Sequence, residues 1–154
     1  MDELRVINQV DSTQYIVIGL GEEQYGVDIK FIDSILRMQR ITRVPKVAPH
    51  LKGVINLRGE VIPVMSLRLK MELPEDEITR ATRIIILKLE QYGMIGIIVD
   101  EVKEVVTLTS DQVQKIAYDA KDESTNYING VGKFDGELIS LLDFNLVMQE
   151  KENA

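Results

Sequence analysis

Short runs of Ile, Val and Leu recur along the whole chain, and Gly, Pro or charged residues interrupt them. Runs of this length, rich in β-branched side chains and bounded by turn-forming residues, are typical of strands. The pattern predicts ten strands, at Tyr15–Leu20, Gln24–Ile29, Ile32–Leu36, Gly53–Leu57, Val61–Leu67, Arg83–Leu89, Met94–Val99, Val102–Thr107, Tyr127–Lys133 and Leu138–Leu142. Strands so short and so closely spaced favour an all-β sandwich or barrel.

Helical signals are few. Ser110–Val113 has the composition of a short capped helix, and the tail from Asp143 to about Glu152 predicts a C-terminal helix. Pro45–Leu51 is too short and too rich in proline for more than one helical turn. The charged stretch Glu72–Glu77 reads as a linker near the middle of the chain.

An internal repeat divides the chain at that linker. Gly53–Leu67 aligns without gaps on Gly130–Phe144, and a weaker match pairs Gly26–Leu36 with Gly96–Val106. The longer match keeps both glycine pairs and three further identities: Val54 with Val131, Glu60 with Glu137, and Ile62 with Ile139. A strand, a glycine-led strand and a glycine hairpin therefore occur twice, which indicates two small β-barrels of similar topology.

The repeat also separates what the fold requires from what one copy requires. Arg58 aligns with Asp135, so the same hairpin position carries opposite charges in the two copies. The fold therefore does not demand arginine there, and Arg58 becomes a candidate anchor for a partner, because arginine suits interfaces. An ordinary surface arginine, or one held in an intramolecular salt bridge, remains the alternative.

Composition disfavours several functional classes. The 154 residues are enough for one ordinary domain or two very small ones, and a net charge of −7 disfavours binding to a nucleic-acid backbone. There is no cysteine, and the single histidine, His50, would have to serve any catalytic triad. His50 follows Pro49 in a turn without a recognisable nucleophile motif, so we interpret it as structural or exposed. No cofactor or metal site is predicted.

Two other motifs have simpler interpretations than a binding site. Gly130-Val131-Gly132 resembles part of a dinucleotide loop, but its third glycine is misplaced and no helix follows, which favours a hairpin. The acidic residues of Glu72–Glu77 lack the ligand spacing of a calcium loop. The N-terminus shows no signal peptide, and the apolar runs are shorter than a membrane helix requires, so we expect a cytoplasmic protein.

Residues around the first hairpin resemble the signature of the CheW-like domain of bacterial chemotaxis. The match consists of Gly53–Gly59 followed by Val61–Val64 and Leu67-Arg68, and three further segments support it: Tyr25–Ile29, Gly96–Val102 and Tyr127–Gly132. Two positions depart from the common pattern, since Ser66 stands where many members have aspartate and Ser34 where an acidic residue is common.

The resemblance implies an all-β fold of two small SH3-like β-barrels packed side by side, with a short C-terminal helix. We expect an N-terminal extension at 1–12, a CheW-like domain at 13–149 and a tail at 150–154. Within the domain, the first barrel would occupy roughly 13–71 and the second roughly 80–144, with an exchange of strands between the halves possible.

The resemblance further implies a non-catalytic adaptor that couples transmembrane chemoreceptors to a chemotaxis histidine kinase. It would bind the receptor's helical cytoplasmic tip in a groove and the kinase's homologous regulatory domain barrel against barrel, and receptors would recruit it to the membrane. The residues expected at the receptor are Ile32, Gly53, Asn56, Leu57, Arg58, Gly59, Gly96, Val99 and Val102.

Apolar positions such as Ile32, Ile35, Val99 and Val102 are candidates for lining that groove, although each taken alone is better explained as core. The surface that meets the kinase is not predicted. Three alternatives remain: a module that regulates a kinase without a receptor, a nucleic-acid-binding β-barrel, which the charge disfavours, and an enzyme, for which no catalytic constellation is present.

Overall fold

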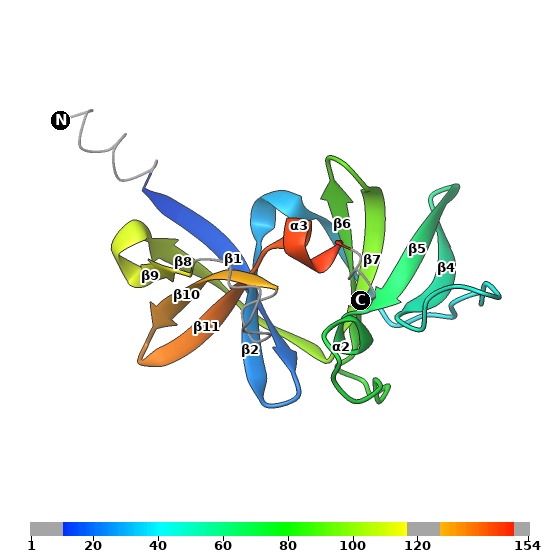
Figure 1. Ribbon diagram of the computed structural model, residues 1–154, viewed down its shortest axis with the longest axis horizontal. Helices are drawn as coiled ribbons and strands as arrows, with labels where there is room; N and C mark the ends of the chain where they lie inside the picture. Colours follow the sequence, from blue (N-terminus) through cyan, green and yellow to red (C-terminus); the bar gives the residue numbers. More distant parts are fainter. Residues whose placement is uncertain (1–10, 117–126, 150–154) are drawn as a thin grey trace, which may run out of the picture. The chain divides into compact units, whose positions relative to one another are not determined.

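The structure, a computed structural model, describes residues 11–116 and 127–149. Strands dominate this part of the chain, and its helices are single turns (Figure 1). The strands are β1 (Ser12–Leu20), β2 (Glu23–Asp28), β3 (Ile32–Arg37), β4 (Leu51–Leu57), β5 (Glu60–Ser66), β6 (Arg83–Leu89), β7 (Gly93–Val99), β8 (Glu101–Thr109), β9 (Val113–Lys115), β10 (Ile128–Phe134) and β11 (Glu137–Leu142). The helices are α2 (Leu67–Lys70), α3 (Phe144–Val147) and the 3₁₀ turns η1 (Ile29–Phe31) and η2 (Ser110–Gln112).

All ten predicted strands are present, with ends shifted by a few residues. The expected C-terminal helix is shorter than predicted, since α3 ends at Val147, and residues 150–152 of the prediction lie outside the described residues. The predicted capped helix at Ser110–Val113 is the 3₁₀ turn η2. The short strand β9 and the single turn α2 were not predicted.

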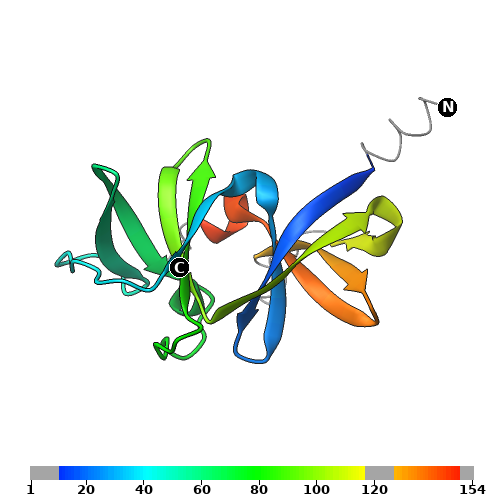
Figure 2. The ribbon, with the colours of Figure 1, turned by 180° about the vertical axis from the view of Figure 1, so that it is seen from behind.

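The strands form two sheets. One has the order β8-β1-β2-β11-β10-β9, and the other has the order β3-β6-β7-β5-β4. In the first sheet β1 and β2 lie side by side, as the blue ribbons show from both directions (Figures 1 and 2). The structure confirms the predicted all-β class, with two small SH3-like units and a short C-terminal helix.

The two units interleave along the chain. Among the described residues, one contains 11–17, 24–29, 104–116 and 127–149, and the other contains 18–23 and 30–103. β6 and β7, which fall in the later half of the chain, lie in one sheet with β3, β4 and β5 of the earlier half. Self-similarity identifies equivalent strands, but it carries no information on which copy each strand pairs with.

The two copies of the repeat exchange strands symmetrically. β5 pairs in parallel with β7, and Val64 lies opposite Gly96; β11 pairs in parallel with β2, and Leu141 lies opposite Gly26. Each hairpin therefore continues its sheet with the glycine-led strand of the other copy. Parallel neighbours require a long connection, which the rest of the chain provides.

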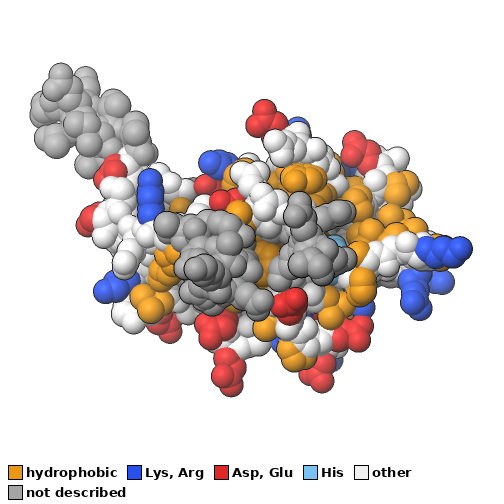
Figure 3. Space-filling view, in the orientation of Figure 1, with side chains coloured by type: hydrophobic (Ala, Val, Ile, Leu, Met, Phe, Trp, Pro, Cys, Tyr) orange, Lys and Arg blue, Asp and Glu red, His pale blue; other side chains and the backbone are white. Residues whose placement is uncertain are grey.

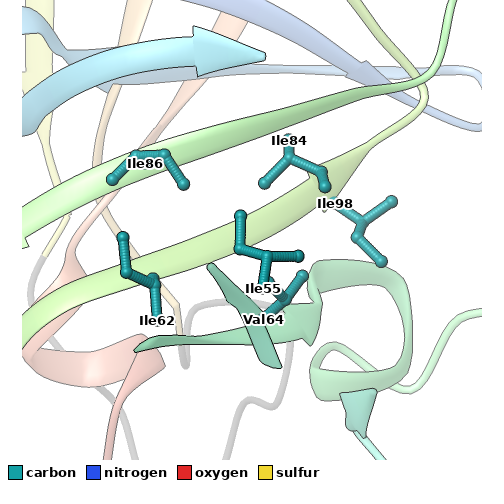
Figure 4. Close-up of a cluster of buried hydrophobic side chains, with 6 residues drawn as sticks. All are labelled: Ile55, Ile62, Val64, Ile84, Ile86 and Ile98. Carbon is teal, nitrogen blue, oxygen red and sulfur yellow. The ribbon is translucent and has the colours of Figure 1, made fainter. Parts of the chain in front are cut away.

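The unit formed by 18–23 and 30–103 has a core of aliphatic side chains from four strands. Ile84 and Ile86 of β6, Ile98 of β7, Ile55 of β4, and Ile62 and Val64 of β5 are at most 3% exposed (Figure 4). Burying each of them contributes about 1.5–3 kcal/mol. The other unit has an equivalent cluster of Val17, Val106, Leu108, Ile139 and Leu141.

Candidate functional site: the β4–β5 hairpin

The turn between β4 and β5 consists of Arg58 and Gly59 alone. Both have positive φ angles, 52° and 84°, as a two-residue turn of type I′ requires. The side-chain Oδ1 of Asn56 accepts a hydrogen bond from the Gly59 N–H at 3.2 Å, which stabilises the turn. The geometry of the turn thus explains why Asn56 and Gly59 have these residue types, but it does not explain the arginine at position 58.

The equivalent hairpin between β10 and β11 turns at Asp135 and Gly136, whose φ angles are 49° and 77°. Aspartate suits the first position of such a turn, whereas a left-handed conformation costs most other residues about 1–2 kcal/mol. Arg58 therefore occupies a position that the fold would fill more easily with Asn, Asp or Gly. The internal comparison supports a specific use of the guanidinium in this hairpin.

The Arg58 side chain reaches across to the start of β3. Its Nη2 lies 2.8 Å from Oδ2 of Asp33, and the same oxygen accepts a hydrogen bond from the Ser34 hydroxyl at 3.1 Å. The intramolecular salt bridge considered as an alternative is therefore present. The Arg58 side chain is still 70% exposed, so an ion pair of this kind contributes little stability and leaves other N–H donors accessible.

A cavity of about 400 Å³ lies beside this ion pair. It combines two cations and two carboxylates with apolar side chains, and its lining residues are Asp33, Leu57, Arg58, Glu60, Ile62, Lys88 and Met94. Such a mixture can hold a protein segment that has both polar and apolar side chains, because partner anchoring relies on arginine and flexible apolar groups.

The structure places the other predicted site residues at different depths. Asn56, Arg58 and Gly59 are exposed, and Ile32, Leu57 and Val102 are half-buried. Gly53, Gly96 and Val99 are buried, and Val99 has no exposed surface. Leu57, Arg58 and the turn residues around them are therefore brought together at the surface, where Arg58 contacts Asp33, the residue that follows Ile32.

Two of the buried positions are glycine for reasons internal to the fold. Gly53 has a φ of 147°, and a Cβ there would lie 2.1 Å from the carbonyl oxygen of Thr42. Thr42 and Val54 exchange two main-chain hydrogen bonds of 2.8 Å at this point. At Gly96 a Cβ would lie 3.1 Å from both Ile84 and Val64. At both glycines the close neighbours are therefore atoms of this chain.

A second ion pair in the same unit was not predicted. Arg68 donates from Nε to Oδ1 of Asp100 at 2.7 Å and from Nη2 to Oδ2 at 2.6 Å, in a bidentate arrangement. The Gly21 N–H also donates to Asp100, at 2.7 Å. The hydrogen bonds from Arg68 lower the pKa of Asp100 below its ordinary value of 3.8, against the opposing effect of partial burial. The signal in the sequence was that Arg68 and Asp100 both belong to the matched motifs.

Ser66, a departure from the family pattern, has a structural place. Its hydroxyl caps α2 by accepting the Leu69 N–H at 3.1 Å, and it donates to Oδ2 of Asp76. The other oxygen of Asp76 is buried without a hydrogen-bond partner in the described structure. The hydroxyl of Ser66 thus lies against a carboxylate from the linker.

The loop between β3 and β4 forms a second exposed surface. With residues 75–78 it encloses a cavity of about 540 Å³, and its half-exposed aliphatic side chains are Val44, Val47 and, from the linker, Ile78. Lysine and arginine side chains gather near the tip of this loop (Figure 3, right). Apolar groups bordered by cations are typical of protein contact surfaces.

Comparisons with known proteins identify what kind of protein carries this site. The sequence model of the CheW-like domain matches residues 14–152. A chemotaxis protein CheW of Bacillus subtilis (strain 168) is 36% identical over 139 residues, which are 90% of this chain and 88% of that protein. A chemotaxis protein CheW of Thermotoga maritima is 30% identical over 85% of this chain and 84% of its own.

A solved structure has the same fold. The crystal structure of the scaffolding protein TtCheW from Thermoanaerobacter tengcongensis has a TM-score of 0.81 and 27% identity, covering 90% of this chain and 93% of that one. Fold and sequence together define a β-rich scaffold protein of chemotaxis. More particularly, the chain belongs to the CheW-like domain family.

Within residues 11–116 and 127–149, no group of three or more His, Cys, Asp or Glu side chains is arranged to hold a metal ion. In the same ranges, none of the helices has the length and apolar character needed to cross a membrane.

Proposed function

We propose that this protein is a non-catalytic adaptor that couples chemoreceptors to a chemotaxis histidine kinase. One surface would bind the cytoplasmic tip of a receptor, and another would bind the regulatory domain of the kinase. The observation that carries the proposal is the Arg58 hairpin, which keeps an exposed guanidinium in a left-handed position within a chain that belongs to the CheW-like family. Such a protein would act in the cytoplasm and reach the membrane through its receptors.

The receptor contact would centre on the exposed part of the hairpin. Arg58 would donate hydrogen bonds to polar groups of the receptor helices, and Leu57 would provide adjacent apolar contact. Asn56 and Gly59 would hold the turn in shape. Ile32 and Val102 are half-buried and would contribute at the margin, while Gly53, Gly96 and Val99 would act from below the surface by shaping the strands.

A coupling protein needs a second contact surface for the kinase. The aliphatic side chains around the loop between β3 and β4 supply one in the same unit as the hairpin. The edge strand β3 of the sheet also offers backbone groups for pairing with a homologous domain, whereas Val54 of the other edge strand, β4, is already paired with Thr42. These features support the proposal that the kinase domain docks against a strand edge.

The test is the affinity of the full-length protein for a purified receptor cytoplasmic fragment and, separately, for the kinase. We expect Arg58→Glu to weaken receptor binding at least about tenfold, because a favourable donor becomes a repelled carboxylate. The fold should tolerate the change, since Asp135 occupies the equivalent turn. Kinase binding should remain unchanged.

Two matched variants control this experiment. Asp135→Arg reverses the charge in the equivalent hairpin and should leave receptor affinity as it was. Asp33→Asn removes the carboxylate that pairs with Arg58 but leaves the positive charge of Arg58 in place, so receptor binding should persist. Unchanged receptor affinity in Arg58→Glu would refute the assignment. Binding of the kinase but of no receptor fragment would favour the alternative of a regulatory module that acts without a receptor.

A further inference from the structure

Three arginines line a cavity at one end of the β3–β6 pair. The cavity measures about 460 Å³, and it is bounded by Arg37, Met38, Thr79, Arg80, Thr82 and Arg83. Arg37 is the last residue of β3, Arg83 is the first residue of β6, and Arg80 lies in the turn before it. The lining contains no acidic side chain, in a protein whose net charge is −7.

The strand register places two of these arginines on opposite residues of the paired strands. Arg37 lies directly opposite Arg83 in the antiparallel pairing of β3 with β6. Side chains so placed have Cβ atoms about 4.5–5.5 Å apart, and like charges there are destabilising. Within the described residues, none of the three arginines forms an ion pair with a carboxylate, whereas Arg58 and Arg68 each do. The register thus places two like charges on opposite residues, an arrangement that a bound anion would stabilise.

Hydrogen bonds between side chains and the main chain hold the turn before β6 in place. Nη1 of Arg83 donates to the carbonyl oxygens of Arg80 at 2.7 Å and Thr82 at 2.9 Å. The turn is closed by the Thr79 N–H, which donates to the Thr82 hydroxyl at 2.9 Å. Arg83 is therefore held in place by main-chain acceptors, and these take none of the donors on its Nε and Nη2.

The surrounding charge and apolar groups indicate what fits. From Ser34 to Gly59 the sequence contains no acidic residue, although it holds four arginines and two lysines. Ile35, 39% exposed, and the half-buried Met38 lie on the same segment. Sites for free phosphate are commonly built from main-chain N–H groups at helix N-termini, whereas this cavity is lined by strand ends and a turn. Guanidinium groups beside aliphatic side chains suit the carboxylates of a protein chain.

We propose that the cavity formed by Arg37, Arg80 and Arg83 binds an acidic, carboxylate-rich segment of a partner protein. Such binding would follow from the register and charge of this unit alone, and it requires neither a receptor nor a kinase. The guanidinium groups would pair with consecutive or alternate carboxylates, and Met38 would contact the aliphatic part of the same segment.

The experiment uses the full-length protein and a fluorescent peptide with four consecutive glutamates, measured by anisotropy at low and at physiological ionic strength. We expect Arg37→Gln and Arg80→Gln each to weaken binding roughly two- to fivefold, and the double variant about tenfold. The matched control is Arg40→Gln, which removes the same charge from a nearby exposed residue outside the cavity and should have little effect. Thermal melting should show Arg37→Gln folded and slightly more stable, because the repulsion with Arg83 is removed.

Each other outcome overturns the proposal. If Arg40→Gln weakens binding as much as the cavity variants, the interaction is with the overall basic surface. If a glutamine peptide binds equally well, carboxylates are not recognised. If inorganic phosphate displaces the peptide at similar concentrations, the cavity is a site for small anions. Absence of peptide binding at low ionic strength would also contradict the proposed binding of an acidic segment.

Discussion

Replacing Gly53 with alanine introduces a methyl group where the chain leaves no room for one. The new Cβ would lie 2.1 Å from the Thr42 carbonyl oxygen, and the residue would have to keep a φ of 147°. The backbone strain costs about 1–3 kcal/mol. Separating Thr42 from Val54 would also break the two hydrogen bonds of 2.8 Å between them, at about 2 kcal/mol for the pair. We therefore expect Gly53→Ala to lower the free energy of unfolding by about 3–5 kcal/mol.

Urea denaturation and thermal melting measure this loss, which corresponds to a fall in Tm of about 6–20 °C for a chain of this size. Gly59→Ala is the matched control: its φ is 84°, but a Cβ there has no atom within 4 Å, so only strain of about 1–2 kcal/mol is expected. Equal destabilisation of the two variants would refute the clash with Thr42. A Gly53→Ala protein of normal stability that failed to bind receptor would instead make Gly53 a contact residue.

Three further perturbations test other parts of the same unit. Arg58→Asn should keep or slightly raise the Tm, since asparagine suits the turn, yet weaken binding to a receptor fragment in a pull-down assay. Asp100→Asn should lower the stability at neutral pH by about 1–2 kcal/mol through loss of the bidentate contact with Arg68. Because the folded-state pKa of Asp100 is lowered, this stabilisation is complete above its ordinary value of 3.8 and disappears at lower pH, so melting temperatures of the two proteins should converge in acid. Ser66→Ala should cost about 1–3 kcal/mol in urea denaturation, because it removes the cap of α2 and the partner of the partly buried Asp76.

The strands were predictable because their signal is local. β-branched runs bounded by glycine or charge identified ten of them, and the repeat identified the two equivalent hairpins. β9 was missed because Val113 is its only apolar residue and its pairing with β10 is set by the backbone. α2 was missed because Leu67 and Leu69 continue an apolar strand pattern, and only the cap at Ser66 interrupts it.

The site was predictable only at positions that the alignment of the two repeat copies covers. Arg58 stood out against Asp135, and the structure places it in an exposed turn. Its partner Asp33 could not be inferred, because nothing local relates the start of β3 to a hairpin on another strand. The contact of Arg68 with Asp100 was hidden for the same reason: it joins two copies of the repeat, whose exchange of strands no periodicity reveals.

The exchange of strands has a consequence for how the protein is made. The unit formed mainly by residues 30–103 has nearly all of its sheet once the ribosome has released β7, so we expect it to fold while synthesis continues. The other unit needs β11 to pair with β2, and these strands are the last and nearly the first to be synthesised. Until the final strand emerges, β2 lacks its partner β11, so the end of translation, rather than its midpoint, sets when the second unit can form.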